Sequence, residues 1–129
     1  MEVNRYAAAA EFRAELRRFL RRSEDLARQH GLTPRQHLLL LQIAGAEEGI
    51  TTVSARVPAL ALTQSAVTEL VQRAEQAGLV QRAGSKLDGR VVHLSLTAEG
   101  ERRLAAVHDA LGPERAQLQS VFESAVSDQ

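Results

Sequence analysis

Five side chains able to hydrogen-bond lie on the outward face of a predicted helix that begins after Thr63 and ends at Gly78. They are Gln64, Ser65, Thr68, Glu69 and Gln72. Such groups suit the donor and acceptor patterns that base edges present in the major groove of DNA. A solvated surface explains the same face equally well, because any exposed helix face carries polar residues.

A glycine-containing turn at residues 84–90 carries the next candidate side chains. The cations Lys86 and Arg90 could reach phosphates or enter a minor groove, and Arg90 is the strongest single candidate. Asp88 can accept a hydrogen bond from an arginine guanidinium and hold that side chain extended. The alternative interpretation is an ordinary charged hairpin turn.

The distribution of charge indicates where a polyanion would dock. The chain of 129 residues has 16 Lys and Arg against 16 Asp and Glu, which gives a formal net charge of zero. This balance argues against strong non-specific binding to nucleic acid. Residues 51–96 nevertheless carry more cations than acids, whereas residues 97–129 are acidic. The middle segment is therefore the expected docking region.

No catalytic or metal-binding pattern stands beside these candidates. The sequence shows no nucleophile with a neighbouring base, no paired carboxylates on one face and no glycine-rich phosphate loop, so we do not expect an enzyme. The histidines, at positions 30, 37, 93 and 108, lack carboxylates or cysteines at metal-ligand spacing. We predict no metal and no cofactor.

Composition favours an intracellular protein. Cysteine is absent, which excludes disulfides and thiolate chemistry within the chain. The longest apolar run, at residues 38–41, is too short to cross a bilayer, and the N-terminus lacks the apolar region of a signal peptide. We expect a cytoplasmic protein without membrane contact.

The elements that must position the candidates are mainly helices. A chain of this length suits one domain, and its 3% aromatic content means a core of Leu, Val and Ala, which favours a mostly α fold. Residues 4–29 form one amphipathic helix that Gly31 can end. A second helix that ends near Ala44 is then predicted from a capping box formed by Thr33 and Gln36, with Pro34 at its first position.

The second half of the sequence predicts a short helix, then a hairpin, and then two further helices. Residues 50–62 indicate a short or kinked helix, since Ser54 could cap it and Pro58 would interrupt it. Residues 79–82 and 91–96 are predicted as two strands. Thr97 caps a helix through residue 111, and Gly112 with Pro113 separates it from a last amphipathic helix.

This order predicts a winged helix-turn-helix, with the DNA-binding lobe at residues 33–97. The terminal segments, 1–30 and 98–129, present long apolar stripes with little local chain to cover them. They are therefore expected to pack together and against a second copy, which makes a homodimer the working hypothesis.

The motifs taken in order resemble the MarR family. They are LTQSAVTELV at residues 62–71, AGLVQR at 77–82, DGR at 88–90 and LTAEG at 96–100. The resemblance spans nearly the whole chain. It implies a homodimeric transcriptional regulator, usually a repressor, on a pseudo-palindromic operator in double-stranded DNA. The helix carrying Gln64 would enter the major groove, and Arg90 in the wing would enter the flanking minor groove.

The resemblance also implies release from DNA by a small ligand, often an aromatic or phenolic acid, that binds between the dimerisation helices and the DNA-binding lobe. His30, Arg35 and His37 lie near that junction and are the candidate ligand-binding residues.

A second hypothesis stays open: a winged-helix dimer that acts as a protein-interaction or small-molecule-binding module with weak or no specific DNA binding. Zero net charge favours it, as does Pro58 inside residues 53–60, where the family has an uninterrupted helix.

Overall fold

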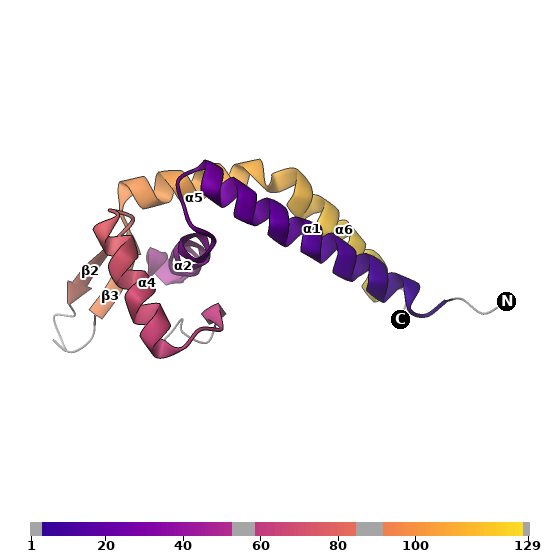
Figure 1. Ribbon diagram of the computed structural model, residues 1–129, viewed down its shortest axis with the longest axis horizontal. Helices are drawn as coiled ribbons and strands as arrows, with labels where there is room; N and C mark the ends of the chain where they lie inside the picture. The colour runs from indigo at the N-terminus through magenta and orange to yellow at the C-terminus, as the bar shows by residue number, and fades with distance from the viewer. Residues whose placement is uncertain (1–3, 53–58, 85–91, 128–129) are drawn as a thin grey trace.

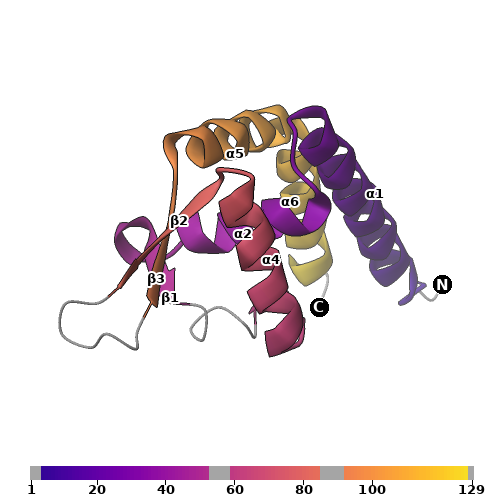
Figure 2. The same ribbon diagram turned by 60° about the vertical axis from the view of Figure 1, so that its left-hand side comes forward.

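The computed structural model describes residues 4–52, 59–84 and 92–127, and within them it shows a small lobe joined to a helical arm. The arm consists of α1 (Ala7–Gln29) and α6 (Gly112–Ser127), which run side by side away from the lobe (Figure 1). The lobe consists of α2 (Pro34–Ala44), α4 (Gln64–Gln76) and a small sheet. Helix α5 (Ala98–Ala110) connects the two parts, as Figure 2 shows from a second side.

Helix α1 follows the predicted apolar stripe. Its residues Leu26 and Ala27 are buried, while Phe12, Leu16 and Phe19 are half-buried. The helix ends at Gly31, which has φ +78°, a left-handed conformation that glycine adopts without a steric penalty. The chain can therefore reverse at Gly31 and enter α2 at once.

Helix α2 lies at the centre of the hydrophobic core. The predicted capping box is present, because the Thr33 hydroxyl accepts from the Gln36 amide at 3.1 Å and the Gln36 side chain accepts from the Thr33 amide at 3.0 Å. Leu39, Leu40 and Ile43 are buried against α4, α5 and the sheet. The prediction for this helix is confirmed at both ends.

The sheet has three strands where the sequence predicted two. A short 3₁₀ turn (Glu47–Gly49) leads into β1 (Ile50–Thr52), which pairs antiparallel with β3 (Val92–Leu96) in the register Ile50 to Ser95. Strand β2 (Val80–Gly84) pairs on the other side of β3, so the order is β1-β3-β2. The expectation that residues 50–62 begin a helix was wrong at its start, since Ile50 and the two threonines are β-branched and favour a strand.

Helix α4 begins and ends where its sequence signals predict. Thr63 caps it by accepting from the Ala66 amide at 3.1 Å. One face is buried in the core, and its residues are Val67, Leu70, Val71 and Ala74. The opposite face is therefore left to solvent.

The first turn of α5 lies against the turn that follows α4. The Thr97 amide donates to the Leu79 carbonyl at 3.1 Å, and the Thr97 hydroxyl donates to the Gly78 carbonyl at 2.6 Å. A Cβ at Gly100 would lie 2.1 Å from the Leu79 carbonyl oxygen. Only glycine allows this approach, since the atom in the way belongs to the backbone and cannot rotate aside.

We expect Gly100→Ala to destabilise the fold by about 1–3 kcal/mol, the usual cost of overpacking. Helix propensity alone would favour alanine by about 1 kcal/mol, so the sign of the change decides between the two effects. The measurement is urea unfolding followed by circular dichroism.

The matched control is Gly112→Ala, where the added Cβ would meet nothing closer than Arg115 Nη2 at 3.9 Å. This variant should unfold within about 0.5 kcal/mol of the original chain. Equal stability of the two variants would show that the contact between α5 and Leu79 tolerates a methyl group.

Candidate nucleic-acid interface

The outward face of α4 presents all five polar residues that the sequence singled out. Gln64, Ser65, Thr68, Glu69 and Gln72 are each exposed. They share this face because the core takes the opposite side of the helix through Val67, Leu70 and Val71. The structure thus places these residues on one solvent-facing helix, while their contacts with DNA stay a prediction.

Two of the five are already engaged within the helix. The Thr68 hydroxyl donates to the Gln64 carbonyl at 3.0 Å. Glu69 pairs with Arg73 one turn later, at 2.6 Å between Oε1 and Nη2. Both members of this pair are well exposed, so the pair contributes at most a few tenths of a kcal/mol to stability. It does, however, offset the negative charge of Glu69 on this face.

The other three side chains of the face are Gln64, Ser65 and Gln72. Within the described part of the chain, they make no hydrogen bond. Gln64 and Ser65 open the helix, and the N-terminal residues of a recognition helix are those that contact base edges. A carboxamide can donate and accept at once, which matches the edge of adenine.

A shallow groove of about 190 Å³ separates α4 from the start of α2. Arg35 and Arg73 line it together with Thr33, Gln36 and Glu69. Arg73 is not among the site residues predicted from the sequence, although its position four residues after Glu69 predicts their pairing. Arg35 therefore lies beside the outward helix and not at the centre of the junction with the arm.

The predicted wing contacts cannot be placed in the same way. Lys86, Asp88 and Arg90 lie outside the described residues, as do Ser54 and Pro58. Strands β2 and β3 lead into that segment from Gly84 and out of it at Val92. The roles of Lys86, Asp88 and Arg90 stay predictions.

The three candidate ligand-binding residues lie in three different settings. His30 lines a shallow groove with Glu99, Arg102 and Arg103. Arg35 lines the groove beside α4. His37 is buried where α2 packs against α5. Among the described residues, His30 and Arg35 line two different grooves, and the part of all three residues in ligand binding stays a prediction.

His37 is a buried titratable group at the junction of lobe and arm. It is 5% exposed, and its ring makes no hydrogen bond within the described part of the chain. Burial, and then the charge of the nearby His108, lower the pKa of His37 from its ordinary value. Arg115 of α6 contacts His108 at 3.3 Å from Nη1 to the carbonyl oxygen, which adds a further positive charge nearby.

None of the helices among the described residues combines the length and the apolar character that crossing a membrane requires. No group of three or more histidine, aspartate or glutamate side chains gathers there in a way that could hold a metal ion.

We expect the fold to lose stability as the pH falls from about 7 to about 5. The unfolded chain binds a proton at His37 below about pH 6.5, whereas the folded chain resists it, so acid favours unfolding. His37→Leu should flatten this dependence. Urea unfolding at several pH values measures the slope. His30→Gln, which removes a histidine outside the core, is the control and should keep the original slope. An unchanged slope in His37→Leu would contradict the assignment.

Comparison with known proteins identifies the fold. A sequence profile of the MarR family matches residues 30–91. No curated protein sequence matches the chain. Among solved structures, the YusO protein from Bacillus subtilis is 25% identical with a TM-score of 0.70, and the match covers 94% of this chain and 92% of that one.

Two further structures share the fold at lower identity. AbsC, a MarR family transcriptional regulator from Streptomyces coelicolor, is 21% identical with a TM-score of 0.71, over 92% of this chain and 80% of that one. A MarR mutant from E. coli, complexed with operator DNA, is 18% identical with a TM-score of 0.66, over 93% of this chain and 80% of that one. Together with the profile match, the helix order and the small antiparallel sheet, they show that the chain has the winged-helix fold of the MarR family.

Proposed function

We propose that the chain is a DNA-binding transcriptional regulator, a repressor, that binds a pseudo-palindromic operator as a homodimer. The observation that carries this proposal is the outward face of α4, with exposed polar side chains at Gln64, Ser65 and Gln72 that make no hydrogen bond to the described residues. The E. coli MarR mutant, which shares the fold, is complexed with operator DNA. A fold of this kind can therefore bind a duplex.

The electrostatics favour recognition through hydrogen bonds more than through charge. Within the described residues, Arg73 pairs with Glu69, and Arg82 pairs with Glu75 at 3.2 Å. Each phosphate contact adds to the salt dependence of affinity, and a cation that is already paired with an acid contributes less to that dependence. Sequence preference would then come mainly from base-edge contacts. The proposed regulator acts where the DNA is, which places it in the cytoplasm.

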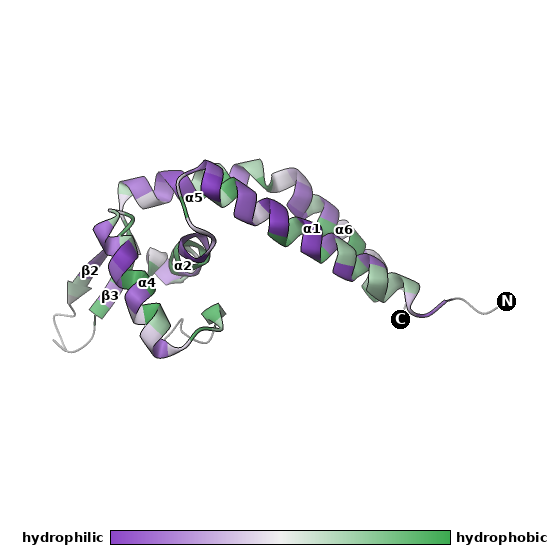
Figure 3. Ribbon diagram, viewed as in Figure 1, coloured by the Kyte–Doolittle hydropathy of each residue, from purple (hydrophilic) through white to green (hydrophobic). Residues whose placement is uncertain are grey.

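The homodimer is proposed from the apolar surface of the arm. Figure 3 shows apolar residues along α6 and at the start of α1. Leu20, Phe122 and Val126 are each about half exposed, at 49%, 52% and 50%. The rings of Phe12 and Phe122 are 5.7 Å apart, so an aromatic cluster joins the two helices at this surface. Covering the exposed half of one such side chain is worth about 1 kcal/mol, so several of them together make a second copy of the arm a favourable cover.

Release by a small aromatic or phenolic ligand forms the last part of the proposal, and it rests on the family resemblance. His37 supports it, because this buried and unbonded ring lies where α2 of the lobe meets α5. A ligand that separated these helices would change the orientation of α4 relative to the arm.

The DNA contacts are tested with Gln64→Ala. A duplex is first selected by the original protein from a randomised pool, and binding is then followed by fluorescence anisotropy. Loss of one bidentate base contact costs about 1–3 kcal/mol, or roughly 5- to 150-fold in the dissociation constant. The preference for the selected base at the contacted position should fall by the same factor.

The matched control is Gln76→Ala, which removes the same side chain from the last turn of the same helix. It is exposed and lies 12 residues further along, at about 18 Å. Its affinity should stay within about twofold of the original. If the two variants bind alike, or if no duplex is enriched, the proposed readout by α4 is wrong, and the protein-interaction hypothesis replaces it.

The dimer is tested with Phe122→Asp, which places a charge in the apolar surface of the arm. Burying an unpaired carboxylate is costly, so the variant should be monomeric at micromolar concentration where the original chain is dimeric. Sedimentation velocity measures the state. Ser120→Asp adds the same charge to an exposed position two residues away and should leave the dimer intact. A monomeric original chain would exclude the two-half-site arrangement.

A further inference from the structure

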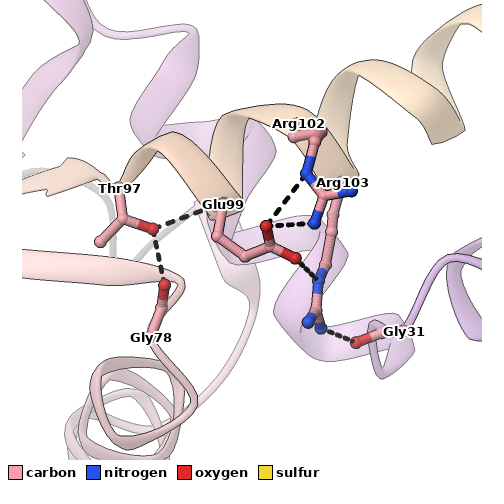
Figure 4. Close-up of polar contacts among 7 residues, drawn as sticks. Gly31, Gly78, Thr97, Glu99, Arg102 and Arg103 are labelled. Carbon is pink, nitrogen blue, oxygen red and sulfur yellow. Dashed lines mark hydrogen bonds and ion pairs between the residues drawn. The ribbon is translucent and has the colours of Figure 1, made fainter.

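The first two turns of α5 contact both the end of the outward helix and the end of the arm. On one side, Thr97 binds the carbonyls of Gly78 and Leu79, directly after α4. On the other side, Arg103 Nη1 donates to the Gly31 carbonyl at 2.8 Å, directly after α1. Figure 4 shows the two sets of contacts on the same stretch of helix. Residues 97–103 are therefore the polar link between α4 and α1.

Arg103 is held in place by a second bond. Its Nε donates to Glu99 Oε1 at 2.7 Å while its Nη1 reaches Gly31, so the two edges of one guanidinium are used. A guanidinium is planar and rigid, and it can span two acceptors in a way that an ammonium group cannot. Glu99 thus fixes the direction in which Arg103 points.

The Glu99 carboxylate is charged under all ordinary conditions. Hydrogen bonds from Arg102, and then from Arg103, lower the pKa of its carboxyl to about 2. Arg102 donates to Glu99 through Nε at 3.0 Å, but unlike Arg103 it makes no hydrogen bond to the α1–α2 turn within the described residues. Arg102 therefore helps to neutralise the charge of Glu99 but does not join α5 to the end of α1.

The turn at Gly31 is shaped for this contact. Its left-handed backbone ends α1, and a Cβ at Gly31 would lie 2.9 Å from Arg103 Nη1. The close approach means that the position of the guanidinium and the end of α1 depend on each other. Leu32, the next residue, is buried in the core, so the turn is anchored on its other side.

Small changes at this link have large effects at the outward helix. A helix of 13 residues is about 20 Å long. A tilt of about 10° would move its far end by about 3.5 Å, close to the rise of one base pair, which is about 3.4 Å. The angle between α4 and the arm therefore decides which spacing of half-sites two lobes can bind together.

We propose that Arg103 is a positioning residue that, held by Glu99, sets the angle of α4 relative to the arm and so selects the half-site spacing of the operator. The proposal rests on the proposed function. In this role Arg103 does not contact DNA directly. Its loss should therefore change how well the protein discriminates between spacings, and it should leave the affinity for a single half-site unchanged.

The experiment compares Arg103→Ala with Arg102→Ala. The probes are the duplex selected by the original protein, the same duplex with one or two base pairs inserted or removed between its half-sites, and a duplex with a single half-site. The original protein should lose about tenfold or more on the altered duplexes, because the two lobes no longer bind simultaneously. Arg103→Ala should bind all spacings within about threefold of one another, with an unchanged affinity for the single half-site.

Arg102→Ala should keep the discrimination of the original protein, since it leaves the Gly31 contact intact. Arg103→Lys serves as the second variant if alanine impairs folding, and it should discriminate less than the original, because an ammonium spans the two acceptors poorly. Full discrimination in the folded Arg103 variants, or its loss in Arg102→Ala, would overturn this inference alone. Failure of the original protein to enrich any duplex would overturn the proposed function, and this inference with it.

Discussion

The backbone of Leu79 lies against the first turn of α5 with no room for a side chain at position 100. The rest of the arrangement depends on this approach. It brings the Thr97 hydroxyl within reach of Gly78, which holds the end of α4, and it directs α5 across the lobe toward the arm. Strand β3 enters α5 at the same point and is paired on both sides by β1 and β2. One backbone contact thus orients the sheet, the outward helix and the connecting helix together.

The polar groups of the molecule fall into two kinds. Those that hold structure are bonded to backbone groups near helix ends, as Thr63, Thr97 and Arg103 are. Those proposed to bind DNA are exposed and make no hydrogen bond to the described residues, as is the case for Gln64 and Gln72. The ion pairs on the surface, such as Glu69 with Arg73, contribute little to stability because solvent screens them. Their effect is to lower the net charge that a polyanion meets on the outward face.

Local signals allowed most of the fold to be predicted. The caps at Thr33, Thr63 and Thr97 act within four residues, so the starts of α2, α4 and α5 are visible in the sequence. Strand β1 was missed because it has three residues and its partner on β3 is more than 40 residues away. The bond between Arg103 and Gly31 joins residues 72 apart, and no spacing rule indicates it. The exposed face of α4 was predictable because the helical period alone separates it from the core.

The pairing of α1 with α6 has a consequence for how the chain reaches its folded state. Arg22 and Glu114, which meet across the arm, are 92 residues apart. Closing a loop of that length costs about 4 kcal/mol in chain entropy, whereas the pairing of β1 with β3 in the lobe closes a loop of about half that length. The lobe is therefore expected to fold first, and α1 and α6 of the arm are expected to pair after the lobe has folded. The same order in reverse makes the arm the first part to open, so the arm can separate and re-form while the lobe stays intact.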